Sequence, residues 1–226
     1  MRLLKKLLVV CGLLLVLGLG AAWAMSRSLP DLPPLKDGDL IFQTSTSNQS
    51  LAILAATASA YSHMGIIRLT ESGPVVIEAA GRVRETPLAA WIARGVLRRV
   101  AVYRDPDLTP GDVERVLARA RSLYGRPYDI FFSFDNDAIY CSELPYLAFQ
   151  AVGLSLGEVQ KVGDLHADNV LVTQLIRKRW QSYAPCTEKG LDFDQCRAAI
   201  MAQPLITPAS IARDARLRPV YSNYPM

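Results

Sequence analysis

The chain has 226 residues, 25 Lys and Arg against 21 Asp and Glu, and a formal net charge of +4. This length predicts one domain, with a core large enough to be stable without disulfides or metals. Three of the positive charges, Arg2, Lys5 and Lys6, lie at the N-terminus, and no basic run interleaved with aromatic residues follows. These features exclude a nucleic-acid-binding surface.

The N-terminus predicts export. Residues 7–24 carry no charge and follow the basic residues, and a helix of this length spans roughly 27 Å, about the thickness of a bilayer core. Ala22-Trp23-Ala24 has the form of a signal-peptide cleavage site. We therefore expect residues 1–25 to be a signal peptide or a membrane anchor. The remainder is then periplasmic or held on the outer face of the cytoplasmic membrane.

The next segment predicts a linker and the start of the folded domain. Residues 26–36 contain Pro30, Pro33 and Pro34, which is typical of a linker. Asp37-Gly38-Asp39 then predicts a turn, with Asp39 as a turn former, so we expect the domain to span residues 37–226. A short strand at residues 40–42 and a helix over residues 49–60 follow.

A β-hairpin is predicted next. Residues 63–69 and 75–79 are apolar β-type runs separated by a polar turn that ends in Gly-Pro. Two registers of this hairpin are open, one with Leu69 opposite Pro74 across a four-residue turn and one with a six-residue turn. Both leave His63 and Glu78 on the same face because strand side chains alternate. Glu78 is flanked by apolar residues, an unusual place for a carboxylate without a partner.

The remaining pattern predicts an α+β fold. Thr109 is a candidate N-cap and Pro110 a first helical residue, and an apolar helical face runs from there to Gly125. The other expected elements are strands at 82–86, 98–104 and around residue 220, a short helix at 87–94, and helices over 141–152 and near 168–182.

Cys141 is the candidate nucleophile. It follows an aromatic loop and opens an apolar helical stripe, so we place it in the first turn of a helix, where the helix dipole favours the thiolate. The alternative is a small buried core residue, the commoner fate of a lone cysteine. Glu143 in the same turn suits a helix cap, and it is also a candidate for substrate contact together with Tyr140.

His63 is the candidate general base for Cys141, and Glu78 is the carboxylate that would orient it. The second histidine, His166, lies in a polar stretch that predicts a surface loop, and is the weaker candidate for the base. With two histidines, no CxxC motif and no Cys/His cluster, we expect no metal site and no cofactor.

Cys186 and Cys196 lie close together in a polar stretch. In an oxidising compartment a bridge between them would stabilise the fold by roughly 2 to 3 kcal/mol. The alternative is two free, partly buried thiols.

Five short runs together resemble the YiiX-type permuted papain-like enzymes of the NlpC superfamily. They are Asp37-Gly38-Asp39-Leu40-Ile41-Phe42, Tyr61-Ser62-His63-Met64-Gly65, Val76-Ile77-Glu78-Ala79, Gly125-Arg126-Pro127-Tyr128-Asp129 and Tyr140-Cys141-Ser142-Glu143-Leu144, with a weaker echo at residues 206–210. The resemblance implies Cys141 as nucleophile, His63 as base and Glu78 as third member. It also implies a small barrel-like antiparallel sheet packed against the cysteine-bearing helix. The chain order His, Glu, Cys implies a circular permutation.

The resulting expectation is an exported cysteine amidase or peptidase that cleaves an amide bond through a thioester, on cell-wall peptides. One alternative is a lipid or lipoprotein acyl hydrolase or acyltransferase with the same three residues. Another is a non-catalytic module that binds an amino acid, a peptide or a lipid. The expected partners are a peptide, amide or acyl substrate of the cell envelope and, if residues 1–25 are retained, the membrane.

Overall fold

The computed structural model describes residues 12, 18, 29–134 and 136–225. The predicted signal peptide or anchor, residues 1–25, therefore lies outside the described residues except at two single positions. Within the described ranges, none of the helices has the length and apolar character needed to cross a membrane.

The centre of the fold is a six-stranded sheet in the order β4-β3-β2-β1-β5-β8, in which every neighbouring pair is antiparallel. A second sheet pairs the two short strands β6 and β7. The strands are β1 (Leu40–Ser45), β2 (His63–Thr70), β3 (Gly73–Ala80), β4 (Arg82–Pro87), β5 (Gly95–Arg104), β6 (Gln160–Lys161), β7 (Pro204–Leu205) and β8 (Arg218–Ser222).

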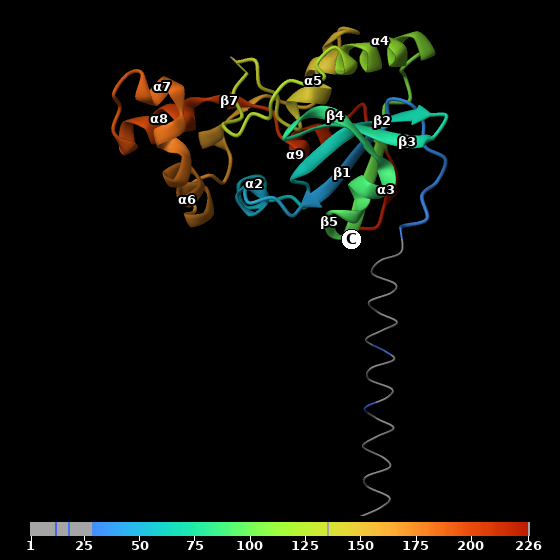
Figure 1. Ribbon diagram of the computed structural model, residues 1–226, viewed down its shortest axis with the longest axis horizontal. Helices are drawn as coiled ribbons and strands as arrows, with labels where there is room; N and C mark the ends of the chain where they lie inside the picture. Colours follow the sequence, from blue (N-terminus) through green and yellow to red (C-terminus); the bar gives the residue numbers. More distant parts are fainter. Residues whose placement is uncertain (1–11, 13–17, 19–28, 135, 226) are drawn as a thin grey trace, which may run out of the picture.

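The helices gather in groups around this sheet. In Figure 1, α4 and α5 lie together on one side of the sheet, and α6, α7 and α8 form a cluster beyond one end of it, with α2 between this cluster and the strands. The α+β prediction is therefore confirmed. The helices are α2 (Ser50–Thr57), α3 (Leu88–Ala93), α4 (Pro110–Arg121), α5 (Glu143–Gln150), α6 (Val170–Arg179), α7 (Ala184–Thr187), α8 (Phe193–Ala202) and α9 (Pro208–Ala212), with 3-10 turns η1 (Val162–Asp164) and η2 (Trp180–Ser182).

Strand alternation places two of the core clusters on opposite faces of the sheet. One sheet face, with Met64, Ile66 and Ile77, packs against α4 and α5. The opposite face, with Ile67 and Val76, packs against Trp91 and Ile92 of α3 and neighbouring residues. Because side chains alternate with period two, this second face is also the one on which His63 and Glu78 lie.

The β2–β3 hairpin adopts the tighter of the two registers. Leu69 pairs with Pro74 and Ile66 with Ile77. The strands approach so closely that a β-carbon on Gly65 would lie 2.5 Å from Val76 Cγ1 and 2.6 Å from the Ile77 carbonyl oxygen. Only glycine fits at this position of β2 without moving the strands apart.

The helix starts agree with the sequence pattern to within two residues. Thr109 caps α4, and its side chain and that of Asp112 form the two halves of a capping box. The helix predicted from Cys141 begins at Glu143 instead, with Ser142 as its N-cap, so Cys141 lies just before the helix. The tail contains α7, α8 and α9, which the pattern of its residues did not predict.

Part of the segment predicted as a linker packs against the sheet. Leu32 and Leu35 pack against the cluster on the α3 side of the sheet. Asp39, predicted only as a turn former, is buried and accepts two hydrogen bonds from Arg104, at 2.6 and 2.7 Å. This ion pair ties the start of β1 to the end of β5.

A disulfide joins the two cysteines of the tail. Cys186 in α7 and Cys196 in α8 have their sulfur atoms 2.04 Å apart. Cys141 is the one free cysteine among the described residues. The disulfide ties together α7 and α8, within the helical cluster that stands beyond the sheet in Figure 1.

Candidate active site

Cys141 is positioned by contacts on both sides. Its thiol donates a long hydrogen bond, 3.9 Å, to the carbonyl oxygen of Ser62, the residue before β2. The neighbouring Ser142 hydroxyl donates to the Ile206 carbonyl at 2.8 Å, which holds this turn against the segment before α9. Cys141 is 2 % exposed. The sulfur therefore lies beside the start of the strand that carries His63.

His63 contacts the buried carboxylate of Glu78. The distance between His63 Nε2 and Glu78 Oε2 is 2.7 Å, and the imidazole stacks on the Trp91 ring with 5.8 Å between centroids. Because Nε2 is occupied by the carboxylate, Nδ1 is the ring nitrogen left for Cys141. The three residues singled out in the sequence are thus brought together.

The charges of this cluster reinforce one another. Burial by itself lowers the pKa of His63, but hydrogen bonds with Cys141 and Glu78 outweigh it and raise the pKa to about 9. Burial raises the pKa of Glu78, but the hydrogen bond and charge interaction with His63, helped by Thr86 and Arg94, lower it to about 2. At neutral pH the cluster therefore holds a carboxylate beside a protonated imidazole.

Glu78 is held by residues that sequence reasoning missed. Its Oε1 accepts a hydrogen bond from Thr86 at 2.6 Å, and Oε2 accepts one from the Trp91 indole at 2.9 Å. Arg94 donates to the same Oε2 and forms an ion pair with it. The strand and helix that carry these residues were predicted, but nothing in the local pattern indicates that their side chains converge on one carboxylate.

A second polar chain ends at Tyr128, which neighbours Cys141. Arg179 of α6 donates to the Gln49 amide oxygen at 3.0 Å, and the Gln49 amide nitrogen donates to the Tyr128 hydroxyl at 2.7 Å. Burial, and after it the neighbouring Cys141, raise the pKa of Tyr128 well above its usual value. Tyr128 belongs to one of the family-like runs, whereas Gln49 and Arg179 carried no sequence signal.

The secondary candidates take supporting positions. The Glu143 carboxylate accepts a hydrogen bond from the Tyr140 backbone N–H at 3.2 Å, as a helix cap would, and burial raises the pKa of Glu143 to about 8. The Tyr140 hydroxyl accepts from the Ile206 N–H at 3.0 Å, while its ring lines a cavity. His166 is exposed in the loop before α6.

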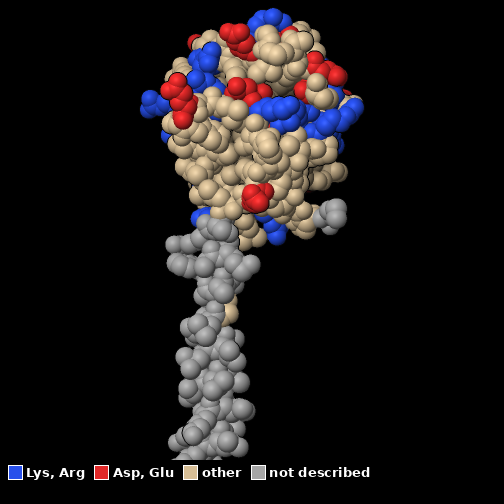
Figure 2. Space-filling model, turned by 90° about the vertical axis from the view of Figure 1, so that its right-hand side faces the viewer, with Lys and Arg blue, Asp and Glu red and all other residues tan. Residues whose placement is uncertain are grey.

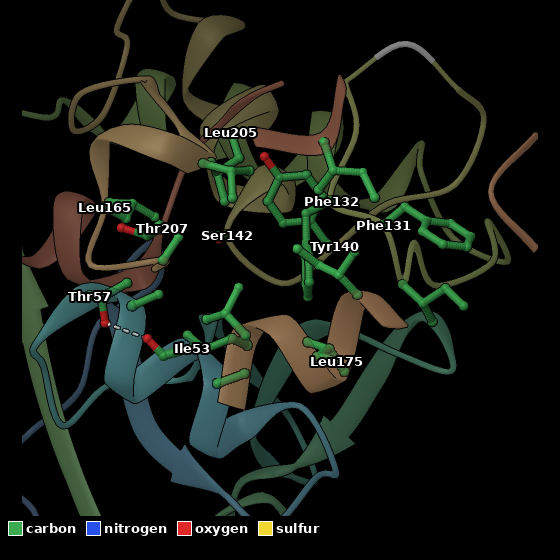
Figure 3. A pocket seen from close by; sticks show the side chains of 18 of the residues that line it. Ile53, Thr57, Phe131, Phe132, Tyr140, Ser142, Leu165, Leu175, Leu205 and Thr207 are labelled. Atoms are coloured by element: carbon green, nitrogen blue, oxygen red, sulfur yellow. Dashed lines mark hydrogen bonds between the residues drawn. The ribbon is translucent and has the colours of Figure 1, made fainter. Parts of the chain in front are cut away.

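Two hollows of opposite character adjoin the cluster. A polar cleft of about 410 Å³ is lined by His63, Tyr128, Arg94 and Arg179 among others. An apolar cavity of about 110 Å³ is lined by Cys141 and mostly aliphatic and aromatic side chains. Figure 3 shows side chains such as Ile53, Tyr140 and Leu175 around this cavity.

The outer surface shows no segregation of charge on the face seen in Figure 2, where basic and acidic side chains are interspersed. The positive groups that matter locally are Arg94 and Arg179, which line the polar cleft. The positive charge that lines the polar cleft therefore comes from these two side chains together with the protonated His63.

A free cysteine just before a helix, next to a histidine and a buried carboxylate on an antiparallel sheet, defines a papain-like cysteine hydrolase. The model of the permuted papain-like amidase family, YaeF/YiiX, C92, matches residues 34–221, and the chain belongs to this family. It is accordingly a cysteine hydrolase of the amidase and peptidase type, acting on peptide or amide substrates.

Two relatives extend this finding. The chain is 37 % identical over 153 residues to the uncharacterized protein YiiX of Escherichia coli (strain K12), which covers 67 % of this chain and 76 % of the relative. It also resembles the crystal structure of metalloprotein yiiX from Escherichia coli O157:H7, with a TM-score of 0.73 and 32 % identity over 84 % of this chain and 98 % of that one.

Proposed function

We propose that the chain is an exported cysteine amidase in which Cys141 is the nucleophile, His63 the general acid and base, and Glu78 the carboxylate that orients His63. The observation that carries this proposal is the 2.7 Å contact between His63, at the start of the strand beside the thiol, and the fully buried carboxylate of Glu78 on the next strand. A buried carboxylate with four donors around it fixes the tautomer and the orientation of the imidazole.

In the first half of the reaction the Cys141 sulfur, having given its proton to His63, attacks the carbonyl carbon of the amide. The oxyanion that forms is stabilised by backbone N–H groups at the start of α5, where the first turn of a helix has no intrahelical partners. His63 then gives its proton to the leaving nitrogen, the C–N bond breaks, and a thioester remains on Cys141.

In the second half, water replaces the departed amine. His63 takes a proton from this water, the hydroxide attacks the thioester carbonyl, and the acid leaves while the thiol is restored. Glu78 stays ionised throughout, because its low pKa reflects the protonated imidazole and Arg94 beside it. Its role is to hold His63 and to stabilise the positive charge on the ring.

Two features support action outside the cytoplasm. Residues 7–24 carry no charge and follow a basic N-terminus, as in signal peptides and anchors. The Cys186–Cys196 disulfide is of a kind that persists in oxidising compartments. We therefore propose cell-envelope peptides as the substrates, with the membrane as partner if the N-terminal segment is retained.

The residues of this chain do not suit a metal at the same site, although the related crystal structure is described as a metalloprotein. Both Glu78 oxygens already accept hydrogen bonds, and Arg94 places a positive charge beside one of them. Within the described part of the chain there is no group of three or more His, Cys, Asp or Glu side chains placed to hold an ion.

Thiol labelling tests the proposed triad. Iodoacetamide modification of the full-length chain, read at the Cys141 peptide by mass spectrometry, is expected to be fast and pH-dependent, and to slow in His63→Ala. The matched control is His166→Ala, which removes the other histidine from an exposed loop. If Cys141 reacts at the rate of an ordinary thiol, and equally in the unmodified protein and in both variants, the result would favour a non-catalytic binding module over an enzyme.

Product analysis tests the substrate class. Peptidoglycan fragments and lipid extracts are incubated with the protein and with Cys141→Ala, and the cleaved bonds are found by mass spectrometry. His63→Ala, incubated in parallel, lacks the general acid and base, and its rate of bond cleavage is expected to be about 10² to 10⁴-fold lower. If neither pool changes relative to Cys141→Ala, the envelope-hydrolase proposal fails.

A further inference from the structure

Cys141 lines the apolar cavity, whereas His63, Tyr128 and Arg94 line the polar cleft, and Arg179 borders both hollows. The His63 and Tyr128 side chains interact with the Cys141 thiol, so the sulfur lies next to both hollows. A substrate whose carbonyl carbon reaches the sulfur therefore has apolar walls on one side of the scissile bond and polar, positively charged walls on the other.

The cavity walls come from several separate parts of the chain. They include α2, α6, the aromatic loop that ends at the cysteine, the segment around η1, and the residues from α8 to the start of α9. Figure 3 shows Ile53 and Thr57 of α2 and Leu175 of α6 facing Phe132 and Tyr140. Thr57 uses its hydroxyl to bond the Ile53 carbonyl at 2.8 Å, so it offers the cavity no free donor.

The direction of the chemistry assigns the two halves of the substrate to the two hollows. His63 must protonate the leaving group, so the leaving group has to lie on the His63 side, which is the polar cleft. The acyl half, which stays on Cys141 as the thioester, then lies on the opposite side of the sulfur. That side is the apolar cavity.

We propose that the enzyme selects substrates with an aliphatic acyl group and a polar leaving group, and that the apolar cavity is the acyl-binding site. This inference rests on the proposed function, because it requires the thioester on Cys141. A cavity of about 110 Å³ is somewhat smaller than the roughly 150 Å³ cavity that holds benzene in an engineered protein. It therefore accommodates a short aliphatic chain or one branched side chain, such as that of leucine.

The test uses full-length protein and amides of p-aminobenzoate, a polar leaving amine, with straight acyl chains from acetyl to dodecanoyl. Each methylene that enters the cavity is expected to raise kcat/KM by about fourfold, until the cavity is full and the rates level off. An amide of N-acetylleucine with the same leaving group is run beside them. A faster rate than the straight chain of equal carbon number identifies peptides as the source of the acyl group, and a slower rate identifies lipid acyl chains.

Variants of the cavity wall change the preferred length in opposite directions. Ala56→Leu, on the cavity side of α2, is expected to move the plateau to shorter chains, and Leu175→Ala, on α6, to longer ones. The control is Leu51→Ala, on the same helix as Ala56 but 64 % exposed to solvent, which should leave the profile unchanged. Since Leu175 is only partly buried, its variant keeps the test valid if Ala56→Leu fails to fold.

The outcomes separate this inference from the function on which it rests. Cys141-dependent hydrolysis with no dependence on acyl length, or with the same profile in all variants, overturns the acyl-binding site and leaves the hydrolase intact. If no substrate is hydrolysed and no thioester forms on Cys141, the proposed function fails, and the acyl-binding site with it.

Discussion

His63 carries more of the proposed chemistry than any other side chain, and its properties depend on neighbours far away in the sequence. Buried alone, it would be neutral at pH 7, because burial disfavours the charged ring. Contact with Glu78 and Cys141 reverses the effect and raises its pKa to about 9. The stabilisation that its extra proton affinity contributes to the fold is complete below its unfolded value of about 6.5 and is lost as pH rises through about 9.

The activity should follow the same proton. We expect kcat/KM to fall as pH rises through about 9, where His63 loses the proton that the leaving group needs. Glu78→Gln removes the negative charge that raises this pKa, so the alkaline limb should move to lower pH. The measurement is the pH profile of kcat/KM for both proteins.

The control for this prediction is Glu71→Gln, which removes a carboxylate from the exposed turn between β2 and β3. Its alkaline limb should match that of the unmodified protein. An alkaline limb that stays in place in Glu78→Gln would show that the carboxylate does not govern the proton on His63.

At the scale of elements, the β2–β3 hairpin does most to shape the site. Its register decides how His63 on one strand lies relative to Glu78 on the other, and the close approach of the strands at Gly65 maintains that register. A hairpin whose strands separate at this point would also separate the imidazole from the carboxylate.

Gly65→Ala should therefore impair both stability and activity. Its β-carbon would collide with Val76 and with the backbone carbonyl of Ile77, which has no rotamer to escape into. We expect a loss of about 1 to 3 kcal/mol in urea unfolding, together with a lower kcat/KM. The matched control is Gly111→Ala in α4, where the nearest atoms are 3.9 Å away and a gain of up to about 1 kcal/mol is expected. Equal free energies of unfolding for the two variants would contradict the claim that the close approach of β2 and β3 excludes a β-carbon at Gly65.

The disulfide between α7 and α8 supports a part of the tail that contains little sheet. Replacing both cysteines, as Cys186→Ser with Cys196→Ser, should lower the free energy of unfolding by roughly 2 to 3 kcal/mol, because the bridge limits the freedom of the unfolded chain. Urea unfolding of the double variant and the unmodified protein, both under oxidising conditions, measures the difference. Coincident unfolding curves would show that the helical cluster holds itself together without the bridge.

At the scale of the whole molecule, the site forms where the sheet meets the surrounding helices. The sheet contributes His63 and Glu78, the turn before α5 contributes Cys141, and α2 with α6 adds the cavity wall. The cavity and the cleft are therefore products of packing among elements from both halves of the chain. A local change in α6 should alter which substrate is preferred while the reacting groups stay in place.

The export prediction also concerns the whole molecule. The test fuses alkaline phosphatase, which is active only when oxidised outside the cytoplasm, to residues 1–36 of this chain. We expect the fusion to be active. The double substitution Leu14→Arg and Leu17→Arg should abolish this activity, because each charge costs about 2.5 to 3.5 kcal/mol within an inserted helix. Leu29→Arg, beyond the uncharged segment, is the control and should remain active. The mass of the mature chain then shows whether residues 1–25 are removed.

Local physics explains what was predictable from the amino-acid order. Alternation with period two places His63 and Glu78 on one face in either register, and the Thr109 cap with Pro110 marks the start of α4. The position of Cys141 near a helix start also followed from the apolar stripe after it. These features depend on residues a few positions apart, whose geometry the backbone determines.

Tertiary packing decided the rest. That the Cys141 sulfur meets Ser62 at the start of β2, that Thr86, Trp91 and Arg94 converge on Glu78, and that α2 and α6 enclose an apolar cavity are all long-range contacts. Such contacts depend on how whole elements pack, and no spacing along the chain encodes the distance between them. For this reason the sequence by itself determined the proposed reacting groups, whereas the support of the Glu78 carboxylate and the shape of the apolar cavity emerged only in the folded protein.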